Sequence, residues 1–322
     1  MRTRDLPALR SLGFGGAQIG NLYRALDDRT ASEAVAAAWD AGVRYFDTAP
    51  HYGLGLSERR LGVALAGRPR DDYVLSTKVG RLIVAHDEPT ASDLENGFAV
   101  AGDRRRVRDY TADGVLRSLE ESLARLRTDR VDIVYIHDPE EPTDRFDEAM
   151  HGAVPALHRL RHEGVIGAWG VGSKDAGILR RFVTQASPDM VMVAGRYTLL
   201  EQDHALMVDC ASHDVAVVAV GVFNSGLLSE RRAGTGSKYD YADAPPELVA
   251  RANAIARVCE EFGVSLPQAA LAYPWRHPAV VNVCVGMRTP DQVRRNVDLM
   301  AGPVPGGLWT ELIERGLVEE NR

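Results

Sequence analysis

The chain alternates between short apolar runs and longer segments in which apolar residues recur every three to four positions. Continuous apolar runs rich in Val, Ile and Gly are typical of strands buried on both faces of a parallel sheet. We predict eight such strands, at Leu12–Gly16, Arg44–Ala49, Val74–Gly80, Ile133–Asp138, Ala168–Ser173, Met190–Tyr197, Val215–Val222 and Val280–Gly286.

The segments between these runs have helical periodicity, with apolar residues on one face. Thr30, followed by Glu33 three residues later, has capping-box spacing, and Ser57 stands at the expected start of the next helix. We predict helices at Thr30–Asp40, Ser57–Ala66, Thr111–Arg127, Arg145–Glu163, Asp175–Gln185, Asp203–His213, Pro246–Phe262 and Pro290–Met300.

Strands that alternate with helices indicate an α/β fold with a parallel sheet. In a chain of 322 residues without a linker, the pattern favours closure into a single (β/α)8 TIM barrel, one domain spanning residues 1–322. An open doubly wound sheet is the alternative. Two long segments, 81–110 and 223–245, follow the third and seventh strands. We predict that they form walls or lids over a pocket, since barrel enzymes keep their active sites at this face.

Composition excludes several classes of partner and site. The net charge is −7, and we interpret the short basic run Arg104–Arg106 as a solvent-exposed loop, so no nucleic acid is expected. No apolar stretch of about 20 residues predicts a membrane span, and the first residues lack a signal-peptide pattern. The cysteines, Cys210, Cys259 and Cys284, are scattered, which argues against disulfides and structural zinc and predicts a cytoplasmic location.

Four titratable side chains stand at the ends of three consecutive predicted strands. Asp47 and Tyr52 follow the second strand, Lys78 lies in the third, and His137 ends the fourth. In a barrel these ends meet at one face. Because a buried lysine is costly without a partner, we expect Lys78 to pair with Asp47.

This combination suits proton transfer. The ordinary pKa of tyrosine is about 10, and an adjacent ammonium lowers it by stabilising the phenolate. We therefore expect Tyr52 to exchange a proton with a carbonyl or alcohol oxygen near neutral pH. His137 would orient that oxygen. Singly, these residues are equally compatible with a structural ion pair, a core histidine and a loop tyrosine; together they favour an active site.

A metal site is the competing chemistry. His51, His137 and Asp138 are candidate ligands. However, no HxH pair follows the first strand, and no glutamate or second histidine stands at the other strand ends, so we expect no metal.

Three stretches, FDTAPHYGLGLSERRLG, STKVG and VYIHD, resemble the aldo-keto reductases, and the likeness extends over nearly the whole chain. The resemblance implies that Asp47, Tyr52, Lys78 and His137 form a catalytic tetrad in a (β/α)8 barrel. It also implies a nicotinamide nucleotide, NAD or NADP, bound without a Rossmann domain. Neither GFGGAQIG nor GLGLS completes the G-x-G-x-x-G pattern, in agreement with this expectation.

The resemblance also implies the residues that bind the cofactor. The matching positions are Gly16, Ala17, Asp47, Ser173, Lys174, Gly221, Val222, Phe223, Asn224, Ser225, Gly226, Leu227, Gly286, Met287, Arg288, Gln292, Arg295 and Asn296. The chain departs from the family at Lys174, where asparagine is common, and at Ala194, where we expect a glutamine. Animal-type reductases hold a 2′-phosphate with a lysine and an arginine near positions 286 and 292. Arg288 and Arg295 are the alternatives here, so both NAD and NADP stay open.

Within the family, GGAQIGNLYRALDD, AGRYTLLEQ and GVFNSGLL look most like the D-threo-aldose 1-dehydrogenase group, which includes L-fucose dehydrogenases, with pyridoxal 4-dehydrogenase nearby. This implies that the substrate is a small molecule, a sugar oxidised at C1 to a lactone. By position, the substrate residues would be Tyr23, His51, Tyr52, His137 and Trp169. NADPH-dependent reduction of an aldehyde or ketone and a non-catalytic cofactor-binding subunit are the alternatives. The sequence does not indicate the oligomeric state.

Overall fold

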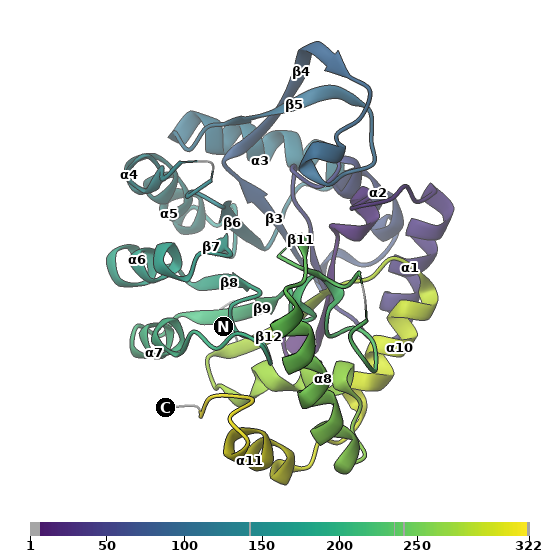
Figure 1. The fold of residues 1–322 in the computed structure, drawn as a ribbon. Helices are drawn as coiled ribbons and strands as arrows, with labels where there is room; N and C mark the ends of the chain where they lie inside the picture. Colours follow the sequence, from purple (N-terminus) through teal and green to yellow (C-terminus); the bar gives the residue numbers. More distant parts are fainter. Residues whose placement is uncertain (1–6, 142, 235, 241, 321–322) are drawn as a thin grey trace.

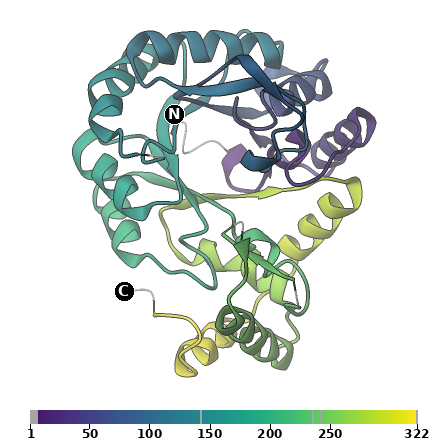
Figure 2. The same ribbon diagram turned by 45° about the horizontal axis from the view of Figure 1, so that its top comes forward.

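The computed structural model describes residues 7–320 except residues 142, 235 and 241. Eight parallel strands of this part of the chain form a closed barrel (Figures 1 and 2). They are β1 (Leu12–Gly15), β2 (Tyr45–Asp47), β3 (Val74–Val79), β6 (Ile133–His137), β7 (Ala168–Ser173), β8 (Met190–Ala194), β9 (Ala216–Val220) and β12 (Val280–Gly286). The barrel closes because β1 pairs with both β2 and β12. The predicted (β/α)8 barrel is therefore confirmed, and the open sheet is excluded.

Helices surround the barrel strands (Figure 2). They are α1 (Asp28–Asp40), α2 (Leu56–Leu65), α3 (Ala112–Leu126), α4 (Phe146–Glu148), α5 (Val154–His162), α6 (Ala176–Ala186), α7 (His204–Ser212), α8 (Pro246–Glu261), α9 (Leu266–Ala272), α10 (Pro290–Ala301) and α11 (Gly306–Glu314). The sequence did not predict α9 and α11. A π-helical turn, Ala149–Ala153, interrupts the single helix predicted over 145–163. Pro155, which has no N–H to donate, is the second residue of α5, which begins directly after this turn.

Two predicted helix starts are wrong. Asp27 caps α1 by accepting from the backbone N–H of Thr30 at 2.8 Å, so Thr30 lies inside the helix. The residue directly before α2 is Gly55, not Ser57, and its φ of 81° lies in the left-handed region. The Ser57 hydroxyl is buried and donates to the carbonyl of Gly16 at 2.7 Å. It therefore ties α2 to the end of β1 instead of capping the helix.

Hydrophobic side chains fill both the barrel interior and the layer between barrel and helices. Successive residues of a strand point to opposite faces. In β7, Ala168 packs in the interior, whereas the fully buried Trp169 belongs to the outer layer. The Trp169 ring packs against His158 of α5 with 4.9 Å between centroids. The structure thus contradicts the prediction that Trp169 lines the substrate pocket.

The segment 81–110, predicted as a loop, contains an antiparallel hairpin of β4 (Arg81–Thr90) and β5 (Gly102–Arg108), at the top of Figure 1. The basic run Arg104–Arg106 lies in β5, and the side chain of Arg106 is only 10% exposed. The interpretation of the run as a loop is therefore wrong, and its interpretation as solvent-exposed is wrong for Arg106. The hairpin escaped prediction because β5 carries arginines on both faces and shows no apolar alternation.

The described residues of the other long segment, 223–245, have little regular structure. It contains a 3₁₀ turn at Asn224–Gly226 and a short two-stranded ladder of β10 (Lys238–Tyr239) and β11 (Ala242–Asp243). Both long segments follow strands at the carboxyl ends, as the sequence indicates. Their closing over a pocket stays a prediction.

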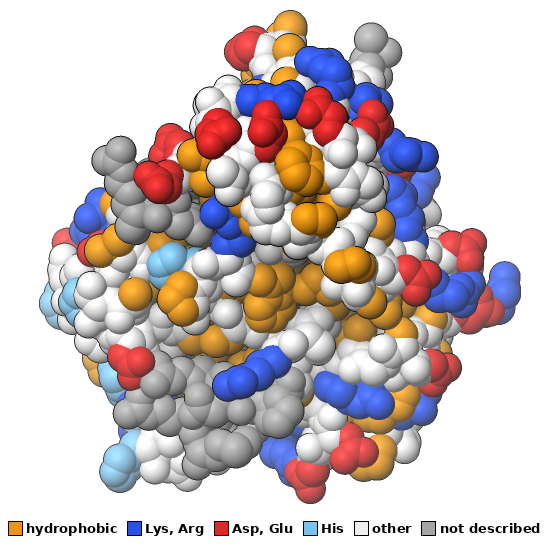
Figure 3. All heavy atoms as spheres, turned by 90° about the horizontal axis from the view of Figure 1, so that it is seen from below, with side chains coloured by type: hydrophobic (Ala, Val, Ile, Leu, Met, Phe, Trp, Pro, Cys, Tyr) orange, Lys and Arg blue, Asp and Glu red, His pale blue; other side chains and the backbone are white. Residues whose placement is uncertain are grey.

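The view in Figure 3 shows hydrophobic side chains in the middle of one face, with charged side chains of both signs around them. Within residues 7–320, excluding the three gaps, no helix is long and apolar enough to cross a membrane. The same residues include no group of three or more His, Cys, Asp or Glu side chains arranged to hold a metal. The three cysteines are free and buried.

Candidate active site

A buried ion pair lies where β2 and β3 end. The Lys78 ammonium donates to both oxygens of Asp47, at 2.9 and 2.7 Å, and to the carbonyl of Thr48 at 2.9 Å. The Ser76 hydroxyl donates to the same carboxylate at 2.7 Å. Burial acts to lower the pKa of Lys78, but the Asp47 carboxylate outweighs it, and the net shift is upward. Lys78 is therefore a fixed ammonium, paired with Asp47 as the sequence indicates.

Tyr52 lies beside this ammonium, with 4.8 Å between Lys78 Nζ and the centre of its ring. Burial raises the pKa of Tyr52 to about 12, although the Lys78 charge acts to lower it. The net lowering that the sequence suggested is therefore not found, because desolvation of the phenolate exceeds the attraction of the lysine. At neutral pH Tyr52 keeps its proton and can donate it to a carbonyl oxygen.

The turn around Tyr52 depends on two glycines. Gly53 has φ 62°, and a Cβ there would lie 2.2 Å from the carbonyl oxygen of Gly20. A Cβ on Gly20 would in turn lie 2.9 Å from the carbonyl group of Tyr52. The two backbones pack directly against each other because neither residue carries a side chain. This contact holds the Tyr52 segment against the loop that follows β1.

Two histidine rings complete the cluster. The His137 ring is perpendicular to that of Tyr52, with 5.9 Å between centroids, and the His51 ring lies 5.6 Å from that of His137. Phe98, from the 81–110 segment, packs against His51 at 5.2 Å. His51 therefore faces the cluster, a question that the sequence left open. Burial first, and then the charge of Arg81, hold the pKa of both histidines well below the usual value, so both rings are neutral at neutral pH.

The two histidines are only partly hydrogen-bonded. Tyr110 donates its hydroxyl to the carbonyl of His137 at 2.7 Å, and His137 Nε2 lies 3.4 Å from an oxygen of Asp138. The Nδ1 atoms of His137 and His51 are buried and have no partner among the described residues. Tyr23, also predicted to contact substrate, is 46% exposed. Its main-chain N–H donates to the carbonyl of Gly97, the residue before Phe98. Tyr23 therefore lies at the rim of the cluster.

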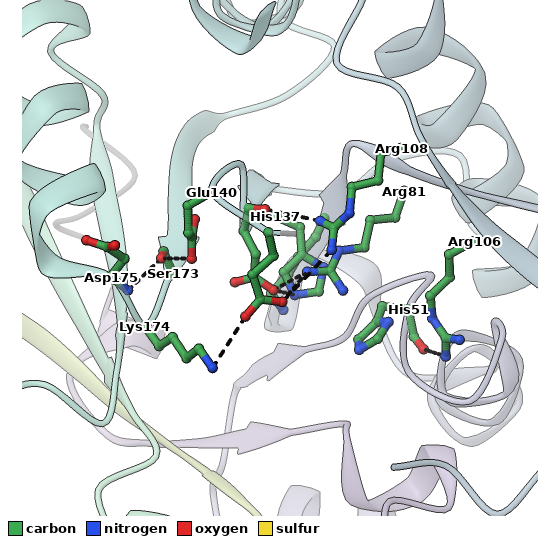
Figure 4. Close-up of polar contacts among 12 residues, drawn as sticks. His51, Arg81, Arg106, Arg108, His137, Glu140, Ser173, Lys174 and Asp175 are labelled. Atoms are coloured by element: carbon green, nitrogen blue, oxygen red, sulfur yellow. Dashed lines mark hydrogen bonds and ion pairs between the residues drawn. The ribbon is translucent and has the colours of Figure 1, made fainter. Parts of the chain in front are cut away.

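Polar groups also gather where β7 ends (Figure 4). The Ser173 hydroxyl donates to Glu140 and accepts from the N–H of Asp175 at 2.8 Å. Burial raises the pKa of Glu140 to about 7, and its Oε2 is buried without a partner among the described residues. Lys174 instead extends toward Glu141, 3.4 Å away. Sequence reasoning missed Glu140, whose signal was its place just after a predicted strand end.

The residues after β8 and β9 form a tight polar turn. Asn224 and Ser225 have φ of 45° and 58°, and Asn224 Nδ2 donates to the carbonyl of Gly195 at 3.4 Å. Asn224 Oδ1 is buried and without a partner in the described part of the chain. Val222 and Leu227 are buried in the core. Because their side chains are buried, Val222 and Leu227 could contact a cofactor only through main-chain atoms.

The predicted adenosine end lies between β12 and α10, and its arginines are engaged. Arg288 is 5% exposed and donates to Gln18 Oε1 at 2.7 Å and to the carbonyl of Leu22 at 2.6 Å. Its N–H donates to Gln292 at 2.8 Å. Arg295 pairs with Glu230 at 3.0 Å.

Four further predicted cofactor residues are buried or lie beside Asp47. Met287 and Asn296 are buried. The Gly16 N–H donates to the carbonyl of Asp47 at 2.7 Å, which places the end of β1, with Ala17 next to it, against Asp47.

The site is distinct from a cavity of about 280 Å³ beside the amino end of β3, which is lined by Gly62, Tyr73 and Leu126. None of the four tetrad residues lines that cavity.

Comparison with known proteins agrees with this geometry. The model of the aldo/keto reductase family matches residues 11–305. D-threo-aldose 1-dehydrogenase of a Pseudomonas species is 46% identical over 97% of this chain and 95% of its own length. Pyridoxal 4-dehydrogenase of Microbacterium luteolum is 37% identical over 96% and 94%. The holo form of an aldo-keto reductase from Bacillus halodurans superposes with a TM-score of 0.71 at 24% identity, over 97% of this chain and 93% of that one. A chain with this match belongs to the aldo/keto reductase family and is an NAD(P)-dependent oxidoreductase.

Proposed function

We propose that this protein oxidises an aldose at C1 to the lactone, with Tyr52 as the general base. The observation that carries the proposal is the placement of the Tyr52 ring 4.8 Å from the Lys78 ammonium, which Asp47 holds in turn. The likeness to D-threo-aldose 1-dehydrogenase supports the choice of substrate class.

The residues at the barrel mouth fit a nicotinamide dinucleotide. Asn224 Oδ1 and Glu140 Oε2 are buried acceptors without partners among the described residues. Amide and ribose hydroxyl groups supply the donors that such acceptors need. Ser173, Glu140, Asn224 and the main chain of 221–227 would hold the cofactor, which, when bound, takes up the hydride from C1.

The protein's own groups handle the proton. In oxidation, the Tyr52 phenolate removes the proton of the anomeric hydroxyl while the C1–H bond breaks with its electron pair and the C1–O double bond forms. The Lys78 ammonium stabilises the phenolate until it takes this proton. His137 and His51, both neutral, orient the reacting oxygen and a neighbouring hydroxyl through ring nitrogens that have no other partner in the described chain.

The polar groups around Tyr52 support a sugar as the substrate. His51, His137 and the rim residue Tyr23 present hydrogen-bonding groups, and Phe98 provides an apolar face against the rings of His51 and Tyr52. A polyol offers hydroxyls to the former and a C–H face to the latter. A second candidate is aldehyde reduction, pyridoxal included, because a Tyr52 with a pKa of about 12 carries the proton that reduction needs.

The test is an absorbance assay of the reduced cofactor with L-fucose, D-arabinose, L-galactose, pyridoxal and simple aldehydes, each with NAD and with NADP. We expect sugar oxidation, faster with NAD, because Arg288 and Arg295 are already bonded and neither is free to hold a 2′-phosphate. Turnover of aldehydes alone with NADPH would replace the proposal by the reductase function. No turnover with any compound would favour the non-catalytic subunit.

Replacing Tyr52 with Phe tests the mechanism itself. We expect kcat to fall by about 10³-fold or more, because general acid–base catalysis contributes about 10²–10⁴-fold and no other residue replaces the phenol. The cofactor affinity, measured by fluorescence titration, should not change. A variant that kept the wild-type rate would contradict the assignment of Tyr52.

A further inference from the structure

The hairpin β4–β5 turns one face toward the catalytic cluster. Arg81 is paired with Arg108, and Ile83 with Arg106, in its antiparallel register. Because paired and alternate residues share a face, these three arginines lie on the same side. Figure 4 shows Arg81 and Arg108 beside His137, and Arg106 beside His51. Arg105 points to the other side, where it pairs with the exposed Asp87 at 3.4 Å.

Arg106 joins the hairpin to the residue before Tyr52. Its guanidinium donates to both oxygens of Asp93, at 2.7 and 2.6 Å, and to the carbonyl of His51 at 2.8 Å. The side chains of Arg106 and Asp93 are only 10% and 6% exposed. A guanidinium can form a bidentate bond to a carboxylate and a third hydrogen bond to a carbonyl at fixed angles, which a lysine ammonium cannot do.

Arg81 makes the corresponding contact on the other side of the cluster. It is 5% exposed and pairs with Asp138, the residue after His137, and its guanidinium lies 3.7 Å from Glu141. Arg108 donates to the main-chain carbonyl of the same Asp138 at 3.1 Å. One oxygen of Asp138 lies 3.4 Å from His137 Nε2. The hairpin thus holds the end of β6 as well as the Tyr52 turn.

We propose that Arg106 and Arg81 are positioning residues of the active site. Through Asp93 and the His51 carbonyl, Arg106 fixes where the Tyr52 hydroxyl meets the reacting oxygen. Through Asp138, Arg81 fixes the ring of His137. The inference rests on the catalytic role of Tyr52 proposed above. It is independent of which carbonyl or sugar is turned over, because both arginines act on protein groups.

The experiment compares Arg106→Ala and Arg81→Ala with Arg105→Ala, which removes a neighbouring arginine from the outer face. The assay uses any substrate that the wild type turns over, in either direction. We expect kcat to fall by about 10–100-fold for the two inner variants, since a 1 Å misplacement of a reacting group can cost about 10²-fold. Cofactor affinity should change by less than about twofold, and Arg105→Ala should keep the wild-type rate.

Chemical rescue separates positioning from fold stability. Free guanidinium ion should restore part of the kcat of Arg106→Ala, and Arg106→Lys should stay slow. The inference is wrong if kcat per cofactor-binding molecule equals that of the wild type in both inner variants. If an alanine variant does not fold, Asp93→Asn replaces it as the test, because this variant keeps Arg106 but weakens its ion pair. Asp93→Asn should still lower kcat several-fold. An unchanged kcat would overturn the inference for Arg106.

Running Tyr52→Phe in parallel distinguishes this inference from the proposed function. An active Tyr52→Phe variant would show that the proposed mechanism fails. An inactive Tyr52→Phe variant beside fully active arginine variants would show that only the positioning role fails.

Discussion

The two halves of the barrel mouth differ in how completely their polar groups are bonded. Where β2 and β3 end, Lys78, Asp47 and Ser76 bond to one another at 2.7–2.9 Å. Where β7, β8 and β9 end, Glu140 Oε2 and Asn224 Oδ1 are buried without partners among the described residues. On the proposed function, the groups that would carry the chemistry are thus fixed before any ligand arrives, whereas those that would bind the cofactor would be completed by it.

Electrostatics explains this division of labour. A proton-transfer site works best when its charges are preorganised, because no reorganisation is then needed during the reaction. A binding site gains affinity when the ligand supplies hydrogen bonds that the free protein lacks, since an unpaired buried acceptor costs about 1–3 kcal/mol. We therefore expect the first half to contribute mainly to rate and the second mainly to cofactor affinity.

The largest test of this comparison is Lys78→Met, in the bonded half. We expect kcat to fall by about 10³-fold, within the range for loss of acid–base function. The free energy of unfolding should fall by about 3–5 kcal/mol, because the Asp47 charge is left buried and unpaired. Chemical denaturation and steady-state kinetics give the two values.

The double variant Lys78→Met with Asp47→Asn provides the control for Lys78→Met. It should recover much of the lost stability without recovering activity, because it removes the unpaired charge along with the catalytic pair. If Lys78→Met were as stable as the wild type, the two halves would not differ as described.

The pH dependence of the rate sharpens the comparison within the bonded half. Because the pKa of Tyr52 is raised to about 12, its ionised fraction is small at neutral pH and grows as pH rises. We expect kcat/KM for oxidation to rise about tenfold per pH unit between about pH 6 and 9 where the chemical step limits the rate. Reduction, which needs the protonated form, should stay level over the same range. An oxidation rate that levelled off near pH 7 would show a Tyr52 pKa much lower than the buried phenol implies.

The smallest effect is expected in the unbonded half, for Asn224→Ala. Loss of one hydrogen bond to the cofactor should raise its Kd by about fivefold, corresponding to about 1 kcal/mol, with little change in kcat. The matched control is Asn253→Ala, because Asn253 bonds to both main-chain groups of Ala233 at 3.0 Å instead of facing the mouth. Fluorescence titration measures both. Equal Kd values for Asn224→Ala and wild type would remove Asn224 from the binding half.

The sequence predicted the fold well because parallel barrel strands must be apolar on both faces, which gives continuous runs that stand out from helical periodicity. The same contrast exposed Asp47, Lys78 and His137 as polar residues at the ends of such runs. The hairpin gave no such signal, because β5 carries arginines on both faces and shows no apolar alternation, and so Arg81 and Arg106 were missed.

Other features depend on contacts that no local pattern encodes. Trp169 and Ala168 are neighbours in the chain, and only the closed barrel decides which faces the interior and which the helices. The pKa of Tyr52 depends on a balance between burial and the Lys78 charge, and the sequence supplied only the second of these. A single domain over 1–322 and a cytoplasmic location stay predictions.

The sequence by itself therefore determined the barrel, the family and the four residues proposed for catalysis, since each depends on residue type at the end of a recognisable strand. Only the tertiary structure decided where His51 faces, which arginines support the Tyr52 turn, and that burial keeps the phenol protonated. These depend on which segments meet in space and how much water they exclude, and residues 51, 93 and 106 meet only after the barrel has closed and the hairpin has folded against it.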